Sequence, residues 1–408
     1  MKRLSHLSPV TSIVVVLGLM IEAALAQGQC YSHWAKQLTV DTGWMANCDR
    51  VFLTTDAGGM WKDITPSQAP KMSTPLSGIS AVSFIDKSTG WVVMYSYYEE
   101  EKTEEGSYNS PTNQFFIAST NDAGARWSYR RVSTPEIDHA GLEASHGLSE
   151  NTSLWFTDAQ HGIMNIGIAV GSGAGGYPAL IVVTSDGGKT WKDIEGASAG
   201  EMLFTTQYDG WIEGQDGLFV TYDGAKTWKE VALPQPEKAE QDPVYLKGSM
   251  PIFPDKDQGF MVAEYRRAGT IETTVLFSSH DGGHTWKPDK VLPRSRDSHT
   301  VFTVLDLGWR TLTLRDHRLI LSSPFASSPL ASAPVDVNLA YVGDVVFLDS
   351  LHGWAVVGAE YGPTQLLSTS NAGASWNIIT PPPPIKGDFV EHPPHLKTGP
   401  LIWKRPTS

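Results

Sequence analysis

The chain of 408 residues carries 31 Lys and Arg against 44 Asp and Glu, which gives a formal net charge of −13 at pH 7. Charged residues make up only 18% of the chain and hydrophobic residues 41%, which excludes a coiled coil or a largely disordered protein. The acidic balance argues against a groove that binds nucleic-acid phosphates. Fourteen tryptophans need a structural reason, because indole rings require burial and a hydrogen-bond partner.

Residues 1–26 have the pattern of a secretory signal peptide. Lys2 and Arg3 precede an apolar run from Val10 to Ile21, and Ala24-Leu25-Ala26 supplies the small residues required at a cleavage site. The apolar run is too short to span comfortably the ~30 Å hydrocarbon core of a membrane, which disfavours the alternative of an uncleaved anchor. We therefore expect a secreted or periplasmic protein with no transmembrane segment after cleavage.

The two cysteines, Cys30 and Cys48, both follow the predicted cleavage site. In an oxidising compartment the simplest expectation is a disulfide between them, which would tie the new N-terminus to the first structural unit. In the chain-entropy model, closing a loop of this size contributes roughly 3 kcal/mol. The alternative of two free buried thiols stays open.

The first repeated signature is a glycine followed by a large apolar residue. Its glycines are spaced 45 to 49 residues apart, except for one interval of 72. Seven occurrences imply seven units, although the long interval leaves open an eighth, degenerate one. The occurrences are Gly43-Trp44, Gly90-Trp91, Gly162-Ile163, Gly210-Trp211, Gly259-Phe260, Gly308-Trp309 and Gly353-Trp354.

The second signature is an octapeptide of Ser or Thr, any residue, Asp, any residue, Gly, two further residues and Trp. Two copies deviate, with Ala225 in place of the Gly and Asn371 in place of the Asp, and the unit after Gly308 has lost the octapeptide. The two signatures together hold eleven of the tryptophans and leave Trp34, Trp155 and Trp403 unexplained. The copies are Thr54–Trp61, Thr120–Trp127, Thr184–Trp191, Thr221–Trp228, Ser279–Trp286 and Thr369–Trp376.

The octapeptide has the chemistry of a β-hairpin turn. The Asp carboxylate can accept hydrogen bonds from backbone N–H groups two and three residues on, while the Gly takes a positive φ. We interpret these positions as structural rather than catalytic, because side chains spread over six separate units cannot converge on one substrate. The positions are Asp56, Asp122, Asp186, Asp223, Asp281 and Asn371.

Short apolar strands such as Leu180–Val183 and Met261–Ala263 lie between the signatures, and no later segment shows sustained helical periodicity. Units of this length, with three or four strands each, cannot bury both faces of their sheets alone and must stack. Seven sheets closing around an axis predict an all-β fold, a seven-bladed β-propeller. We expect the propeller over residues 27–380 and a Pro-rich tail over residues 381–408.

The octapeptide is similar to the Asp-box, or BNR, repeat. Several units also carry Phe-x-Asp ahead of the Gly-Trp pair, as in Phe84-Ile85-Asp86, and over residues 34–380 the chain resembles the propeller family of photosystem II assembly and stability factors and, more distantly, sialidases. The resemblance implies the fold, but Asp-box propellers include several unrelated activities, among them sialidases and xyloglucan-degrading hydrolases. The Arg-Ile-Pro type motif of sialidases is absent, and the chain has room for one propeller where xyloglucan hydrolases generally use two.

The resemblance also implies where ligands bind. In such propellers the Asp-box joins the third and fourth strands, and the binding loops lie on the opposite face, between the second and third strands and between consecutive blades. Aromatic and acidic residues follow the Gly-Trp strands there, which suits a sugar or a peptide. The ligand-binding candidates are Tyr95, Tyr97, Glu213, Glu264, Tyr265, Arg266, Glu360 and Tyr361.

We therefore predict an exported, non-enzymatic propeller that acts as a binding or assembly scaffold for a protein or carbohydrate ligand, as a monomer without cofactor, metal or nucleic acid. The alternative is a carbohydrate-active enzyme, a glycoside hydrolase or a sialidase-like protein. It needs two carboxylates roughly 5 to 10 Å apart, or a Tyr and a Glu with an arginine cluster. The arginine candidates are Arg266, Arg267, Arg310 and Arg315.

Two stretches lengthen individual units. The His and carboxylate pattern of Asp138–Glu150 is interpreted as a surface loop rather than a metal site, because no helix is expected to fix its register. The acidic stretch 98–113 is expected to be a solvated loop, and a role for it or for the tail in binding stays open.

Overall fold

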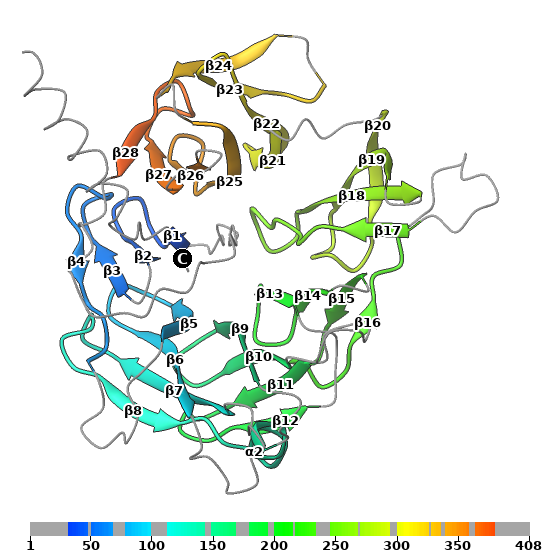
Figure 1. Cartoon of the computed structure of the whole chain (residues 1–408). Helices are drawn as coiled ribbons and strands as arrows, with labels where there is room; N and C mark the ends of the chain where they lie inside the picture. Colours follow the sequence, from blue (N-terminus) through cyan, green and yellow to red (C-terminus); the bar gives the residue numbers. More distant parts are fainter. Residues whose placement is uncertain are drawn as a thin grey trace, which may run out of the picture.

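The computed structural model describes residues 32–47, 50–67, 78–98, 112–142, 148–168, 179–194, 200–214, 217–233, 245–267, 270–293, 300–325, 328–335, 339–358 and 364–379. These residues form seven antiparallel sheets, each made of four strands that are consecutive in the chain. Figure 1 shows the sheets arranged as blades around an axis. The predicted all-β, seven-bladed β-propeller is confirmed, and the 72-residue interval holds no eighth sheet within these residues.

The strands of each blade pair in chain order, from the first strand to the fourth. The blades comprise β1 (Ser32–Gln37), β2 (Gly43–Asn47), β3 (Arg50–Thr54) and β4 (Lys62–Asp63); β5 (Gly78–Phe84), β6 (Gly90–Tyr98), β7 (Thr112–Thr120) and β8 (Ser128–Arg131); β9 (Leu148–Phe156), β10 (Gly162–Ile168), β11 (Ala179–Thr184) and β12 (Lys192–Ile194); β13 (Gly200–Phe204), β14 (Gly210–Gly214), β15 (Gly217–Thr221) and β16 (Lys229–Glu230); β17 (Tyr245–Gly248), β18 (Gly259–Arg267), β19 (Thr270–Ser279) and β20 (Lys287–Pro293); β21 (Thr300–Leu305), β22 (Gly308–Arg315), β23 (Arg318–Ser322) and β24 (Pro329–Pro334); β25 (Tyr341–Phe347), β26 (Gly353–Gly358), β27 (Thr364–Thr369) and β28 (Asn377–Ile379).

One short helix, α2 (Pro135–Leu142), lies between β8 and β9, where the sequence predicts a surface loop. Thr134 caps this helix, since its hydroxyl oxygen accepts a hydrogen bond from the N–H of Ile137 at 3.2 Å. Pro135 suits the first helical position, and the buried Ile137 anchors the helix in the core between blades 2 and 3. Eight residues are too few to show a helical period. No helix in the described part of the chain is long and apolar enough to cross a membrane.

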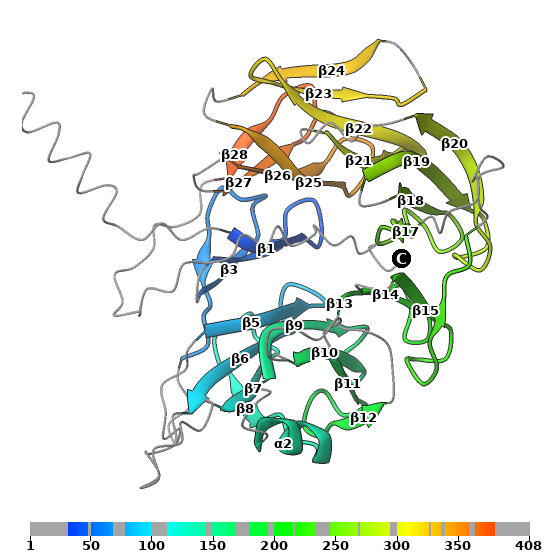
Figure 2. The same ribbon diagram turned by 45° about the vertical axis from the view of Figure 1, so that its right-hand side comes forward.

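The hydrophobic core lies between neighbouring blades rather than within them. Each cluster of buried side chains combines residues of adjacent blades, as when Trp44 and Leu53 of blade 1 pack with Phe84 of blade 2. Similar clusters join blades 2 to 7 in turn. First strands also contact one another at β5 and β9, at β9 and β13, and at β21 and β25. Figure 2, turned by 45°, shows the blades packed side by side around the axis.

A recurring aromatic contact fills these interfaces. Between blades 2 and 3 and between blades 4 and 5, the Trp of a Gly-Trp pair packs against a Phe that lies six residues before the second strand of the next blade, and the octapeptide Trp of that next blade packs against the same Phe. The ring centroid of Phe156 lies 3.6 Å from that of Trp91, with the rings parallel, and 6.3 Å from that of Trp191, in edge contact. Phe253 packs between Trp211 and the octapeptide Trp of its own blade. The two sequence signatures therefore belong to one interface.

This packing explains why a glycine starts the second strand. A Cβ added at Gly90 would lie 2.2 Å from the ring of Phe84, and one added at Gly210 would lie 2.3 Å from the ring of Phe204. Carbon atoms do not approach so closely, and any larger residue would displace the ring. The glycine is required by close approach of an aromatic ring to the backbone.

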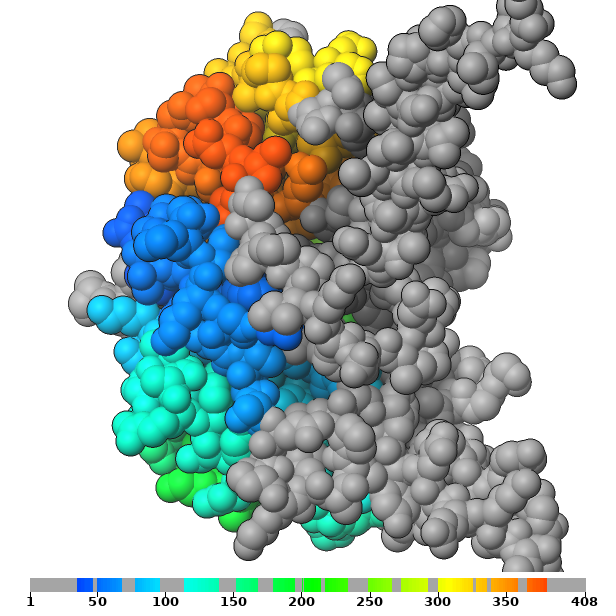
Figure 3. Space-filling model, turned by 60° about the vertical axis from the view of Figure 1, so that its left-hand side comes forward, coloured from blue at the N-terminus to red at the C-terminus, as the bar shows by residue number. Residues whose placement is uncertain are grey.

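The ring closes where blade 7 meets blade 1. Trp354 is only 1% exposed, its ring centroid lies 6.1 Å from that of Trp61, and a Cβ added at Gly43 would lie 2.3 Å from its ring. Ile379 of β28 packs equally closely on Gly58 in the octapeptide of blade 1. Figure 3 shows blades 7, 1 and 2, coloured orange, blue and cyan, in contact along this side. Because no strand is exchanged between the first and last blades, closure depends on these side chains.

Replacing Trp354 with alanine should lower the free energy of unfolding by about 3 to 5 kcal/mol, because it leaves a large cavity at the closing interface. Urea unfolding followed by far-ultraviolet circular dichroism measures this loss. Ile378→Ala, at an exposed position of the same blade, is the matched control and should cost less than about 0.5 kcal/mol. A loss below about 1 kcal/mol for Trp354→Ala would contradict the closing role.

Candidate functional site

Six blades use the octapeptide as the turn between their third and fourth strands, and blade 3 illustrates its hydrogen bonds. The Thr184 hydroxyl donates to Oδ1 of Asp186 at 2.8 Å, and its oxygen accepts from the N–H of Gly188 at 2.9 Å. Oδ1 of Asp186 also accepts from the N–H groups of Lys189 and Thr190, and Oδ2 accepts from the Thr190 hydroxyl at 2.6 Å. The carboxylate thus bonds N–H groups three and four residues on, not two and three as the sequence suggested.

Two consecutive residues of each turn have a positive φ, where one was expected. They occupy the fourth and fifth positions of the octapeptide, with φ of 78° at Gly187 and 86° at Gly188 in blade 3. This double left-handed bend turns the following N–H groups back toward the carboxylate and moves the hydrogen bonds along by one residue. Ala225 of blade 4 keeps the same conformation at 69°, and its side chain is fully buried in the core.

Each octapeptide is also bonded to the connection between the first and second strands of its own blade. The N–H of its fourth residue donates to a carbonyl there, as from Gly187 to Gln160 and from Gly224 to Tyr208, both at 2.9 Å. The same bond recurs in all six blades that carry the octapeptide. Both kinds of connection lie on one face of the ring, which we call the octapeptide face, and these bonds hold them together.

The octapeptide carboxylates are held in the ionised form. Partial burial of Asp186 opposes its charge, but hydrogen bonds from Thr190 and Thr184 outweigh that effect and lower its pKa to about 2. The hydrogen bond from the Arg126 side chain is the main cause that lowers the pKa of Asp122 to about 2. Such strong acids, with their oxygens already bonded, are poorly suited to proton transfer near neutral pH.

Six of the eight ligand-binding candidates belong to the later parts of the second strands β6, β14 and β18, toward the face opposite the octapeptides. Tyr95 of β6 is half-buried and packs against the core between blades 2 and 3. Tyr97 and Arg266 occupy β6 and β18, but their side chains fall outside the described part of the structure. Glu360 and Tyr361 lie outside the described residues, as do Cys30, Cys48, the predicted leader and the tail.

The described members of this set lie at blade interfaces. Oε2 of Glu213 accepts a hydrogen bond from the N–H of Met250 at 2.9 Å, which links blades 4 and 5. Tyr265 is buried in the core that these blades share, and burial raises its pKa to about 12. Glu264 is also buried, on the other face of β18 with Val262, which packs toward blade 6. Glu213 and Tyr265 therefore share one interface, whereas Glu264 and Tyr95 belong to two others.

Two of the arginine candidates lie at opposite ends of one strand. Arg310 and Arg315 of β22 are separated by about 17 Å at the usual ~3.3 Å rise per residue, so they cannot contact the same small group. Arg310 donates to the Trp309 carbonyl at 2.9 Å. Arg267, like Arg266, has a side chain outside the described part of β18.

The stretch Asp138–Glu150 begins in helix α2 and not in a loop. The Asp138 carboxylate accepts hydrogen bonds from Arg131 at 2.8 Å and from Ser133 at 2.6 Å. Within the described ranges of the chain there is no group of three side chains that could hold a metal ion.

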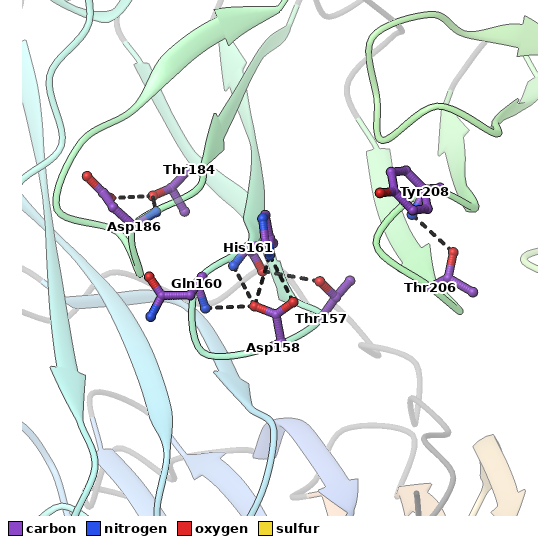
Figure 4. A network of polar contacts seen from close by, with 8 residues as sticks. All are labelled: Thr157, Asp158, Gln160, His161, Thr184, Asp186, Thr206 and Tyr208. Atoms are coloured by element: carbon purple, nitrogen blue, oxygen red, sulfur yellow. Dashed lines mark hydrogen bonds and ion pairs between the residues drawn. The ribbon is translucent and has the colours of Figure 1, made fainter.

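A cleft of about 310 Å³ opens on the octapeptide face between blades 3 and 4. It is bordered by Trp155, Thr157 and Asp158 of blade 3 and by residues 204–208 of blade 4. Figure 4 shows Asp158 with its hydrogen bonds on one side, and Thr206 and Tyr208 on the other. The sequence patterns point to the opposite face and so miss this cleft. One signal was available, because blade 4 lacks the Asp two residues after the Phe that blades 2, 3, 5 and 7 carry.

Comparison with known proteins gives a weak sequence match. No family model matches this chain. It is 23% identical over 286 residues to a sialidase of Micromonospora viridifaciens, a match that covers 62% of this chain and 43% of the sialidase. The chain thus spans less than half the length of that relative. The match supports a sialidase-like β-propeller.

Two solved structures illustrate the structural similarities. The GH74 xyloglucanase from Xanthomonas campestris has a TM-score of 0.30 and 12% identity, over 86% of this chain and 62% of that one. Trypanosoma rangeli sialidase in complex with the inhibitor DANA has a TM-score of 0.36 and 10% identity, over 83% of this chain and 55% of that one. Similarities at these TM-scores say nothing about the activity of this chain.

The stability of the fold should decrease as the pH falls from about 4 to about 2. The pKa of Asp122, Asp186 and Asp281 is about 2 in the folded chain, below the ordinary value of 3.8, so folding favours their ionised form. Their contribution is complete above the unfolded pKa and is lost as the pH falls through the folded pKa. Urea unfolding at several pH values between about 5 and about 2.5 measures the loss.

Blade 7 supplies the control, because Asn371 already takes the place of the aspartate. Its Oδ1 accepts from the N–H of Ser375 and its Nδ2 donates to the Ser375 hydroxyl, both at 2.9 Å. The combined variant Asp122→Asn, Asp186→Asn and Asp281→Asn should therefore fold at neutral pH and show a flatter dependence below about pH 4. A dependence as steep as that of the wild type would contradict the prediction.

Proposed function

We propose that this protein is an exported, non-enzymatic β-propeller that acts as a binding or assembly scaffold, with its ligand on the face opposite the octapeptides. The observation that carries the proposal is the contrast between the two faces. Connections on the octapeptide face are nearly uniform around the ring, whereas those on the opposite face vary widely in length. Variation in loops on a constant framework is typical of a binding surface.

The octapeptide face repeats with little change from blade to blade. Its connections between third and fourth strands have seven residues in six blades, and those between first and second strands have five residues in five blades. The hydrogen bond from the octapeptide to the neighbouring connection recurs six times. This face therefore serves to hold the strands of each blade in register.

The connections on the opposite face are unequal in length. Connections between second and third strands have two residues in blades 1, 4, 5 and 6, five in blade 7, ten in blade 3 and 13 in blade 2. Those between consecutive blades range from five residues after β12 to 16 after β8. Unequal connections on otherwise similar blades make this face asymmetric, which suits the recognition of one particular partner.

The described carboxyl groups with a clearly shifted pKa are not of the kind that serves as a general acid. In a glycoside hydrolase that uses two carboxyl groups, the acid has a raised pKa. Every described carboxyl group whose pKa departs clearly from its ordinary value has a lowered pKa. These groups are Asp56, Asp63, Asp122, Asp158, Asp186, Asp223, Asp281 and Asp349.

We also propose that the chain is related to Asp-box propellers, that it is exported and that it binds a protein or a carbohydrate. Kinship with Asp-box propellers of the photosystem II assembly-factor type is supported by the six octapeptides and the Phe-x-Asp segments. Export is supported by the signal-peptide pattern of residues 1–26, and it would favour a disulfide between Cys30 and Cys48. The scaffold acts as a monomer on a protein or a carbohydrate.

A carbohydrate-active enzyme is the second candidate, and the sialidase match over 286 residues is the observation that favours it. The match covers less than half of the sialidase, so the activity of that protein is no more than a hypothesis for this chain. Such an enzyme would take its carboxylates from the face opposite the octapeptides, among Glu213, Glu264 and Glu360.

The purified chain should release no sialic acid from 3′-sialyllactose and no reducing sugar from xyloglucan between about pH 4 and about pH 8. Colorimetric assays against a buffer blank check this expectation. Turnover that disappears in Glu264→Gln or Glu360→Gln, with an unchanged circular dichroism spectrum, would establish the enzyme instead.

Partner binding should depend on the long connection of blade 2. Replacing residues 99–111 with Gly-Ser gives that blade the two-residue length of blades 1, 4, 5 and 6, and should lower capture of the bound protein or glycan at least about tenfold. Quantitative affinity capture from the producing cell's envelope extract measures this loss. Lys226→Ala, in the exposed part of an octapeptide, is the control and should capture as much as the wild type. Equal capture by both variants would contradict the proposed face.

A further inference from the structure

We propose that the cleft between blades 3 and 4 on the octapeptide face binds a neutral saccharide of one or two sugar units. This site goes beyond the proposed function, which concerns the opposite face. The cleft combines an exposed aromatic ring, hydroxyl and amide side chains and one carboxylate. This combination suits a sugar, whose apolar face stacks on aromatic rings while its hydroxyl groups form hydrogen bonds.

The size and rigidity of the cleft fit a small ligand. Its volume of about 310 Å³ lies at the lower end of the range of small-molecule pockets. Two buried rings, Trp155 and Phe204, lie in its wall. Phe204 is held by edge contact with Trp228 at 6.2 Å, and the ammonium group of Lys36 lies 4.2 Å from the Trp155 ring centroid. The site is therefore formed before a ligand arrives.

Tyr208 is the stacking surface. It is 54% exposed, although its backbone is fixed, because its N–H donates to Oγ1 of Thr206 at 3.0 Å and its carbonyl accepts from the N–H of Gly224 at 2.9 Å. In blade 3 the carboxylate of Asp158 caps the equivalent connection, whereas in blade 4 the neutral hydroxyl of Thr206 does so. A large ring exposed on a fixed loop loses little conformational freedom when a sugar stacks on it.

Trp155 forms part of the cleft wall, and its indole N–H is buried. The residue is only 3% exposed, and its indole Nε1 has no acceptor in the described structure. Seven other tryptophans share this lack, but Trp155 is the one that borders the cleft. Because this nitrogen is buried and the same lack recurs at tryptophans away from the cleft, Trp155 contributes to the cleft as part of its wall rather than as a donor.

The charge of the cleft selects against acidic sugars. Asp158 is the charged residue that borders it. Partial burial of Asp158 raises its pKa, but hydrogen bonds from the N–H groups of Gln160 and His161 outweigh that effect and leave the pKa below its ordinary value. Nδ1 of His161 lies 3.1 Å from Oδ1 and 2.9 Å from Oδ2 of this carboxylate. The ionised carboxylate repels a sugar carboxylate, and its remaining lone pairs can accept from a sugar hydroxyl. The ligand class is therefore neutral, unlike sialic acid.

Isothermal titration calorimetry on the full chain tests this proposal with lactose, cellobiose, maltose and N,N′-diacetylchitobiose, and with 3′-sialyllactose as the acidic probe. At least one neutral disaccharide should bind with a roughly millimolar Kd, and 3′-sialyllactose should bind at least about tenfold more weakly. Tyr208→Ala should weaken that binding at least about tenfold, whereas Tyr208→Phe, which keeps the ring, should stay within about twofold.

Leu351→Ala is the matched control, because Leu351 is exposed and its carbonyl accepts the same octapeptide N–H in blade 7. It should leave binding unchanged, and thermal unfolding should show that all variants are folded. The proposal is overturned if no neutral disaccharide binds, if Tyr208→Ala binds as well as the wild type, or if 3′-sialyllactose binds best.

The variants separate this site from the proposed function. Saccharide binding that survives Tyr208→Ala but is lost when residues 99–111 are shortened belongs to the opposite face, and overturns the cleft alone. Saccharide binding that is lost in Tyr208→Ala and kept in the shortened variant supports the site in the cleft. That result does not depend on whether the opposite face binds a partner.

Discussion

Packing of aromatic rings between neighbouring blades is the interaction on which this ring of blades depends, and at two interfaces a phenylalanine ring lies between two tryptophans. Phe156 illustrates it, with Trp91 of the preceding blade on one side and Trp191 of its own blade on the other. A four-stranded blade cannot bury both of its faces, and these large flat side chains supply the missing apolar surface. The same contact leaves no room for a side chain at the start of the second strand, which explains the recurrent glycine.

Because packing fixes the blades so firmly, the two faces of the ring are free to differ. On one face, six octapeptides and their hydrogen bonds repeat the same solution. On the other, connections range from two residues to 16, and every blade keeps four strands in the same order. The described candidate residues near that face, such as Glu213 and Tyr265, help to join blades 4 and 5. Recognition there would then rest on the connections more than on the strand ends.

The cleft between blades 3 and 4 comes from a local departure within the repeated face. Blade 4 replaces the usual aspartate of its first connection with Thr206, and the neighbouring Tyr208 is left exposed beside Asp158 of blade 3. One altered connection is enough to form this cleft, because hydrogen bonds to the octapeptides already hold the connections of blades 3 and 4 on both sides of it. The two proposed ligand sites therefore lie on opposite faces, and one scaffold could hold two different partners at once.

The sequence by itself determined the all-β blades and the position of six of their turns, because each unit carries its own glycine followed by a large apolar residue and six units carry the octapeptide, whose chemistry is local. It did not reveal helix α2, which Thr134 caps and Ile137 anchors in a core built mostly by distant strands. Nor did it show that Glu264 and Tyr265 face different interfaces, or that Thr157 and Tyr208 border one cleft. Only the tertiary structure decided these points, since contacts between blades join residues far apart in the chain, which no local pattern records.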